Sequence, residues 1–210
     1  MNNFKRLSAI AAPLMRPNID TDVIIRIDRM VGNSIRGTLG QWCLAAWRYL
    51  PDGSEDPAFI LNREPYRRAE ILIAGHNFGC GSSREPAVWA LQEMGIRAVI
   101  ASGFGDIFYN NCFQNGVLPV ILDEATVEQI ARAVEESQGS GKVTVDLEDG
   151  VVIDPNGGRH PFQVEPRRRT ALIEGLDEIG MTMRGHDKIA AFQQRDRALR
   201  PWIYFAGAKA

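Results

Sequence analysis

The chain has few cysteines, and none of them are closely spaced. Its 210 residues include three, Cys43, Cys80 and Cys112. An odd number of widely separated cysteines is no disulfide framework, so we expect a reducing compartment, the cytoplasm. Without a C-x-x-C pair there is no local spacing for zinc or an iron–sulfur cluster. We therefore expect this chain to bind no metal and no cofactor of its own.

The sequence also lacks long apolar runs and a strong excess of charge of one sign. No apolar run approaches the ~20 residues that a membrane helix needs, so we expect no membrane partner. The formal net charge is −2, which gives no basis for binding nucleic acid. The N-terminus has no sustained apolar core, so a signal peptide is not expected. Apolar residues make up 45% of the chain, which predicts a globular protein with its own core.

The most informative stretch is residues 71–95, ILIAGHNFGCGSSREPAVWALQEMG. Its first four residues form a short apolar run that predicts a buried strand over 71–74. The glycines of Gly79-Cys80-Gly81 allow backbone conformations that other residues rarely adopt, which predicts a tight turn. An apolar face at helical spacing follows, and Gly95 is placed to end that helix in a left-handed conformation.

Polar residues gather where this helix is expected to begin. We predict Ser82 as the N-cap and Glu85, three residues later, as the partner that closes a capping box. Unpaired N–H groups and the helix dipole favour an anion at such an end. Arg84 adds a planar fork of donors suited to a carboxylate or a phosphate. The stretch therefore predicts a small anion site with a candidate nucleophile or base; the plainer alternative is a cap and a turn without function.

Strand and helix patterns alternate along the rest of the chain, and hairpin patterns follow them. Strand patterns occupy residues 4–12, 71–74, 98–101, 117–122, 143–147, 151–153 and 160–164. Helix patterns occupy residues 41–50, 107–114, 123–137, 166–175 and 186–200, and a turn is expected at 176–180. This order predicts an α/β fold with a mixed sheet. We expect a single domain over residues 1–210, with residues 166–210 a helical C-terminal extension packing on it.

Two segments ahead of the central stretch are rich in polar residues. Asn18, Asp20 and Asp22 lie within five residues, which predicts a loop that hydrogen-bonds its own backbone. No third ligand follows at the spacing of a calcium loop, so a metal site is not predicted there. Residues 26–40 contain three arginines and three glycines, which predicts a mobile loop. From the residues alone, Arg36 in this loop is a surface arginine.

Three motifs together resemble the signatures of one family. They are N-F-G-C-G-S-S-R-E at residues 77–85, N-x-D-T-D-x-I at residues 18–24, and G-I-R-A-V-I-A-x-x-F-x-D-I-F-x-N-N-x-x-x-N-G-x-L-P at residues 95–119. They are similar to those of the small subunit of 3-isopropylmalate dehydratase, which is itself similar to the mobile C-terminal swivel domain of aconitase. The resemblance covers nearly the whole chain and implies a three-layer β/β/α swivelling domain. We expect structural hydrogen bonds rather than ligand contacts from the asparagines of the third motif, Asn110, Asn111 and Asn115.

The resemblance also implies a reaction and a partner. The family interconverts 2-isopropylmalate and 3-isopropylmalate by dehydration and hydration in leucine biosynthesis. The chain is thus expected to be part of a hydro-lyase that acts on a small dicarboxylic hydroxy acid. Hydroxide leaves well only with a Lewis acid, and in the family this is the iron of an iron–sulfur cluster on a separate large subunit. We therefore expect activity only when this chain is joined by a cluster-bearing large subunit.

The family's functional positions match residues of this chain. Ser82 matches the catalytic base, whose alkoxide a helix N-terminus and Arg84 would stabilise. The residues that the match implies for substrate binding are Arg36, Ser83, Arg84, Thr21 and Asp22. Ser83 and Arg84 would hold carboxylate oxygens, and Arg36 would hold the other end of the substrate. A serine that acts as base is in tension with a serine that caps the helix; if Ser83 is the cap, Ser82 is freed.

Two positions depart from the family's pattern. Pro86 stands where the usual string continues with histidine, and Arg26 stands where the family commonly has proline. Proline is tolerated in the first turn of a helix, so the fold is expected to survive. Two alternatives stay open: the small subunit of a related hydro-lyase for another alkyl-substituted malate, and a non-catalytic anion-binding module.

Overall fold

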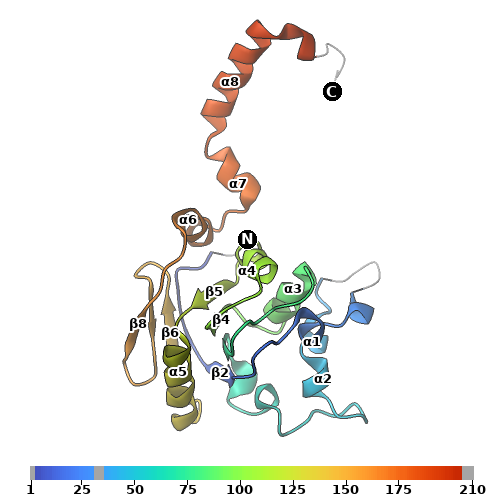
Figure 1. Ribbon diagram of the computed structural model, residues 1–210, viewed down its shortest axis with the longest axis vertical. Helices are drawn as coiled ribbons and strands as arrows, with labels where there is room; N and C mark the ends of the chain where they lie inside the picture. Colours follow the sequence, from blue (N-terminus) through green and yellow to red (C-terminus); the bar gives the residue numbers. More distant parts are fainter. Residues whose placement is uncertain (1–2, 31–35, 205–210) are drawn as a thin grey trace. The chain divides into compact units, whose positions relative to one another are not determined.

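The computed structural model describes residues 3–30 and 36–204 of the chain (Figure 1). The chain forms two compact units that divide after Gly175. The strands are β1 Arg6–Ala9, β2 Ala11–Leu14, β3 Ile71–Ala74, β4 Ala98–Ala101, β5 Leu118–Ile121, β6 Val143–Asp146, β7 Val151–Ile153 and β8 Arg159–Pro161. The α-helices of the first unit are α1 Thr21–Ile24, α2 Ala45–Arg48, α3 Glu85–Glu93, α4 Asp106–Asn115, α5 Glu124–Glu136 and α6 Pro166–Glu174. Its 3-10 helices are η1 Ile27–Arg29, η2 Gly40–Trp42, η3 Ile60–Asn62 and η4 Tyr66–Arg68.

The strands form two four-stranded sheets of different kinds. Strands β2, β3, β4 and β5 are adjacent in that order and parallel, with Ile71 opposite both Ala11 and Ala98. Strands β1, β6, β7 and β8 form an antiparallel sheet. Helices connect the parallel strands because parallel neighbours need a crossover connection. The predicted α/β class is confirmed, but the predicted mixed sheet is wrong in detail, because strands of the two directions form two separate sheets.

The single strand predicted over residues 4–12, ending before Pro13, is wrong in detail. The segment forms two strands, β1 in the antiparallel sheet and β2 in the parallel sheet, with Ile10 between them. The Ile10 carbonyl accepts hydrogen bonds from the N–H groups of Glu70 and Ile71, at 3.1 and 3.3 Å. Pro13 lies inside β2, which is an edge strand, where proline is tolerated. The apolar pattern does not reveal where a strand changes sheets.

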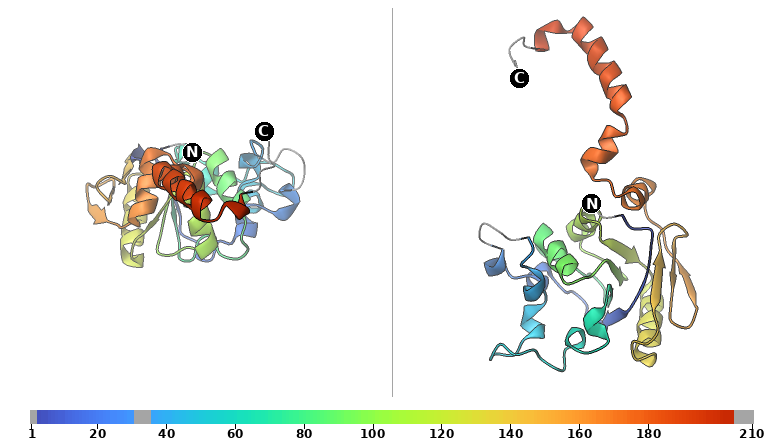
Figure 2. Two further views of the ribbon diagram at one scale, coloured as in Figure 1. Left: turned by 90° about the horizontal axis from the view of Figure 1, so that it is seen from above. Right: turned by 180° about the vertical axis from the view of Figure 1, so that it is seen from behind.

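The parallel sheet is the middle of three layers (Figure 1, Figure 2). Successive residues of a strand point to opposite faces of the sheet. One face packs against α1, α3 and α4 in a buried cluster that includes Leu72, Val99 and Leu91. The other face packs against α5 and the antiparallel sheet in a second cluster that includes Ile73 and Ile100. This is the β/β/α arrangement that the resemblance implies.

Helix ends follow local signals in some places and not in others. Gly95 ends α3 with a φ of 100°, as predicted, and Asp123 caps α5 by accepting the Thr126 N–H at 3.0 Å, where a helix was predicted to begin. The helix predicted over residues 41–50 is broken at Leu44, which has a φ of 55°. Only η2 and the four-residue α2 remain of it.

The second unit consists of helices, α7 Glu178–Met183, α8 His186–Leu199 and η5 Pro201–Ile203. The turn predicted at residues 176–180 is wrong, because Asp177 caps α7 by accepting the Gly180 N–H at 2.7 Å. Within this unit the buried Asp196 accepts a hydrogen bond from the Tyr204 hydroxyl at 2.7 Å. That residues 176–204 pack on the first unit stays a prediction.

Helix α6 belongs to the first unit. Leu172 is fully buried in the cluster beside the antiparallel sheet, and its carbonyl accepts the Phe4 N–H at 2.8 Å. Across residues 3–30 and 36–204, no helix combines the length and the apolar character that crossing a membrane requires.

Candidate functional site

The candidate site forms where β2 and β3 end. The segments that follow these two strands run side by side, joined by main-chain hydrogen bonds. The Gly79 N–H donates to the Ile19 carbonyl at 2.7 Å, and the Thr21 N–H donates to the Cys80 carbonyl at 3.0 Å. Parallel strands present their carboxyl ends at one edge of the sheet, where ligands bind in open α/β sheets. Two motifs that are far apart in sequence therefore meet at this edge.

The turn that presents the serines requires glycine at Gly79. Its φ is +71°, and a Cβ at this position would lie 2.2 Å from the ring of Phe108. Gly81 also has a positive φ, +89°, but a Cβ there would meet nothing closer than 3.4 Å. Packing as well as backbone conformation thus excludes other residues at Gly79, whereas at Gly81 only backbone conformation disfavours them.

Ser82 and Ser83 lie in the turn rather than in the helix. α3 begins at Glu85, with Arg84 at the N-cap position, and no side chain caps it. The predicted capping box is therefore wrong. Pro86 in the first turn restricts how far back the helix can extend, and the Glu85 carboxylate is engaged by an asparagine of α4.

This arrangement removes the tension between capping and catalysis. Both serines are exposed, and among the described residues neither hydroxyl has a hydrogen-bond partner. The main chain of Ser82 is nevertheless fixed, because the hydroxyl of Thr21 donates to its carbonyl at 3.1 Å. Thr21 is itself 1% exposed. The position of Ser82 is thus fixed through its main chain, while its hydroxyl remains available to a ligand.

Arg84 pairs with Asp22 across the two segments. One terminal nitrogen of Arg84 donates to the Asp22 carboxylate, and the Arg84 side chain is 18% exposed. Asp22 lies in the first turn of α1, which Asp20 caps by accepting the Val23 N–H at 2.7 Å. The pair uses one nitrogen of the guanidinium, which leaves the other donors of the fork for an anion.

The start of α3 has the properties of an anion site. The N–H groups of Ser83, Arg84 and Glu85 have no acceptor within the described part of the chain. The dipole of this nine-residue helix places partial positive charge at the same end. Together with the Arg84 guanidinium, these groups suit a carboxylate or a phosphate.

Arg36 reaches α3 from a different segment. Its guanidinium donates to the Asn115 side-chain oxygen at 2.9 Å and lies over the Trp89 ring, 4.2 Å from the ring centre. The Asn115 amide in turn donates to the Glu85 carboxylate at 2.9 Å. Arg36 is thereby connected to the first turn of α3 through side chains. Residues 31–35 of the predicted mobile loop lie outside the described residues.

The described residues offer no ligand set for a metal or a cluster. No group of three or more histidine, cysteine, aspartate or glutamate side chains is placed there to hold a metal ion. Cys43 and Cys112 are fully buried in the apolar cluster on the helix side of the sheet. Burial raises the pKa of Cys43 to about 12 and raises the pKa of Cys112. Two of the three thiols are thus held neutral in the core, which does not fit a cluster that needs thiolates.

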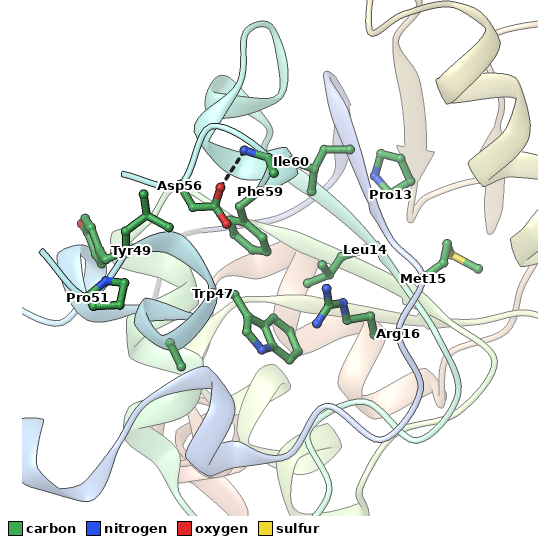
Figure 3. A pocket seen from close by; sticks show the side chains of 13 residues that line it. Pro13, Leu14, Met15, Arg16, Trp47, Tyr49, Pro51, Asp56, Phe59 and Ile60 are labelled. Atoms are coloured by element: carbon green, nitrogen blue, oxygen red, sulfur yellow. Dashed lines mark hydrogen bonds between the residues drawn. The ribbon is translucent and has the colours of Figure 1, made fainter. Parts of the chain in front are cut away.

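A separate groove opens beside β2 (Figure 3). Its wall includes Trp47, Phe59 and Arg16, and the Arg16 guanidinium lies over the Trp47 ring, 4.6 Å from the ring centre. None of the predicted site residues lines this groove. It is therefore not part of the candidate site.

The sequence predicts the turn at residues 79–84 better than it predicts the side chains around that turn. The structure brings Thr21 and Asp22 to the turn that carries the serines and Arg84, but it connects Arg36 only through other side chains. The contacts of Arg36 with Asn115 and Trp89 give no local signal, because the residues are distant in sequence. Asn115 forms structural hydrogen bonds, as predicted for the asparagines of the third motif.

The chain matches three family models along its length. The aconitase C-terminal domain matches residues 1–125, and the family described as LeuD_N matches residues 128–166. The C-terminal domain of the 3-isopropylmalate dehydratase small subunit matches residues 178–206. A protein named 3-isopropylmalate dehydratase small subunit, from Cupriavidus necator, is 50% identical over 99% of this chain and 100% of the relative. One of the same name from Gluconobacter oxydans is 49% identical, over 97% of this chain and 96% of the relative.

A solved structure has the same fold. It is the crystal structure titled 3-isopropylmalate dehydratase from Methanocaldococcus jannaschii, with a TM-score of 0.62 and 24% identity. The match covers 91% of this chain and 99% of that chain.

Proposed function

Since the chain belongs to the family of 3-isopropylmalate dehydratase small subunits, we propose that its turn 79–84 supplies the base and part of the carboxylate site of this hydro-lyase. The enzyme interconverts 2-isopropylmalate and 3-isopropylmalate by loss and return of water, in leucine biosynthesis. A small subunit implies a large one, so the proposed working form is a heterodimer or a higher assembly. The biosynthetic role and the unpaired cysteines favour the cytoplasm as its location.

The iron–sulfur cluster expected for this family is proposed to lie on the large subunit. The cysteines of this chain support that division, because Cys43 and Cys112 are buried in the core and only Cys80 is partly exposed. What this chain contributes is proton removal and the binding of carboxylates.

Ser82 is the proposed base that takes the proton from the substrate carbon. A serine hydroxyl normally holds its proton far above pH 7, so it needs help to exist as an alkoxide. The start of α3 provides this help, since both the helix dipole and the charge of Arg84 favour a negative oxygen beside them. The proton passes to the Ser82 oxygen and hydroxide leaves the neighbouring carbon, so the net loss is one water.

The remaining predicted residues have proposed roles in binding and orientation. Ser83 and Arg84, with the free N–H groups of α3, hold one carboxylate of the substrate, and Arg36 holds the other end. Asp22 orients the Arg84 fork through their ion pair. Thr21 fixes the main chain of the residue that acts as base.

The single observation that carries the proposal is the placement of Ser82. Its hydroxyl is exposed and free within the described residues, its carbonyl is held by Thr21, and it lies just before unpaired N–H groups of α3. If Ser82 only capped the helix, its side-chain oxygen would accept a hydrogen bond from one of those N–H groups.

Reconstitution tests the function. The purified chain mixed with a cluster-loaded large subunit should form 2-isopropylmaleate from 3-isopropylmalate, and the chain alone should not. Malates with other alkyl groups are assayed in parallel, because Pro86 and Arg26 depart from the family's pattern. A higher kcat/KM for another alkyl group would make the chain part of a related dehydratase. If the two subunits assemble but turn over no malate, the chain would instead be a non-catalytic anion-binding module.

A further inference from the structure

Glu93 is a glutamate in an unfavourable place. It is the last residue of α3, where the negative end of the helix dipole disfavours a carboxylate. Its carboxylate instead accepts three main-chain hydrogen bonds, from Gly37 at 2.6 Å, Leu39 at 2.5 Å and Gly40 at 3.0 Å. Hydrogen bonds to an ionised acceptor are stronger than neutral ones, so this carboxylate ties the segment 36–40 to the helix.

The segment also packs tightly against the end of α3. A Cβ on Gly40 would lie 2.7 Å from the carbonyl carbon of Glu93, so the approach is possible only for glycine. Leu39, next to it, is fully buried. Residues 37–40 are therefore docked on α3 by both hydrogen bonds and packing.

Arg36 begins this docked segment, and Asn115 holds its guanidinium. The Asn115 oxygen accepts from Arg36 and from the Trp89 indole N–H, both at 2.9 Å. Its amide nitrogen donates to the Glu85 carboxylate and to the Asn111 carbonyl, both at 2.9 Å. With all these partners satisfied, the amide has one orientation, which presents its oxygen to Arg36. The ring of Trp89 supports the guanidinium from its face.

We infer that Glu93 and Asn115 are positioning residues that hold Arg36 ready for the substrate. This inference rests on the proposed function of Arg36. An arginine that is already fixed loses little conformational freedom when it binds a carboxylate, so its binding is stronger. Glu93 places the main chain of Arg36, and Asn115 with Trp89 places its guanidinium.

A double-mutant cycle in the assembled enzyme tests Glu93. If it acts through Arg36, Glu93→Ala should lower kcat/KM by about tenfold or more, mainly through KM, and Glu93→Gln, which keeps one acceptor oxygen, should recover part of the loss. In the Arg36→Ala background, Glu93→Ala should change kcat/KM by less than about twofold. Equal losses in both backgrounds would overturn the inference. Glu128→Ala, which removes an exposed glutamate of α5, is the matched control and should change neither value.

The indole N–H resonance of Trp89 provides a readout that does not need activity. In the 15N-labelled full chain, Trp89→Phe identifies this signal among those of the four tryptophans. Glu93→Ala and Asn115→Ala should both shift it, and Glu128→Ala should not. An unshifted signal in Glu93→Ala would overturn the inference while leaving the proposed function intact. Unchanged kinetics in Arg36→Ala would instead overturn the proposed role of Arg36, and this inference with it.

Discussion

The two halves of the candidate site are held in different ways. The turn that carries Ser82 is fixed mainly by its own backbone, through the main-chain bond of Gly79 to the segment after β2 and a second bond from that segment to Cys80. The hydrogen bonds that fix the segment carrying Arg36 come from two side chains, those of Glu93 and Asn115, in addition to the packing of its end against α3. Main-chain bonds do not depend on which side chains are present, whereas side-chain bonds are lost by one substitution.

This difference means that the positions of Ser82 and Arg36 depend on the fold to different degrees. Once the parallel sheet forms, the position of Ser82 follows from neighbouring strand ends and from a turn that only glycine can make. The position of Arg36 can change without any change in the sheet. Substitutions that disturb the placement of each half should therefore act on the first half through the stability of the fold and on the second half through substrate binding.

Gly79→Ala should have the largest effect on stability, because it disrupts the turn that carries Ser82. The added Cβ overlaps the Phe108 ring and the residue is left-handed, so the free energy of unfolding should fall by about 3 kcal/mol or more. Gly81→Ala is the control, since it adds left-handed strain without a clash and should lower the same quantity by about 1–2 kcal/mol. Chemical denaturation measures both. Equal losses would mean that the contact with Phe108 does not constrain the turn.

Ser82→Ala should reduce turnover of the assembled enzyme by about 100-fold or more, the range of a lost general base. The free energy of unfolding should change by less than about 0.5 kcal/mol, because the hydroxyl caps nothing and Thr21 bonds the unchanged carbonyl. Ser83→Ala is the neighbouring control and should raise KM more than it lowers kcat. A large loss of stability with near-normal turnover in Ser82→Ala would show a structural role instead.

Arg84→Lys should lower kcat/KM by about tenfold although the charge is kept, because a point charge replaces a planar fork. The ion pair with Asp22 can still form, so assembly with the large subunit should persist. Arg132→Lys, at an exposed pair on α5, serves as the control for the substitution itself. Wild-type kinetics in Arg84→Lys would remove this residue from the site.

The rates of cysteine labelling should also differ between the two halves of the site, although this effect is expected to be smaller than those above. Cys80 lies partly exposed in the Ser82 turn, and Cys43 lies buried just after the segment that Glu93 holds. Alkylation of the native chain at pH 8 should modify Cys80 and spare Cys43, and Glu93→Ala should speed the labelling of Cys43. Mass spectrometry of the digested chain separates the two sites. Rapid labelling of Cys43 in the unsubstituted chain would show that its segment is not held.

The same thiol predicts a dependence of stability on pH. Burial raises the pKa of Cys43 from its ordinary value of 9.0 to about 12 in the folded chain. Above pH 9.0 the unfolded chain loses the proton while the folded chain keeps it, so stability is full below that pH and falls as the pH rises toward 12. Cys43→Ala should reduce the slope of the free energy of unfolding over this window, as denaturation at several pH values would show.

Much of the fold could be predicted because its signals are local. The runs that form β3 and β4 are short and apolar, and Asp123 and Gly95 mark helix ends by their own chemistry. The change of sheet at Ile10 could not be predicted, since it depends on which strands lie on either side. The break at Leu44 has no local sequence signal.

The site shows the same division. The glycines and serines of the turn identify it, but the start of α3 could not be predicted, because the bond between Glu85 and Asn115 competes with a capping box. The role of Glu93 depends on a loop distant in sequence. Its one local sign is an acidic residue at the end of a helix, where the dipole disfavours it.

The role of Ser82 as the base is tested most directly by isotope exchange. In the assembled enzyme, the carbon-bound hydrogen of the substrate is followed as it exchanges with solvent deuterium, which isolates proton transfer from product release. Ser82→Ala should slow this exchange by about 100-fold or more, while Ser83→Ala should leave it near normal at saturating substrate. Normal exchange in Ser82→Ala would contradict the assignment and place the base elsewhere in the assembly.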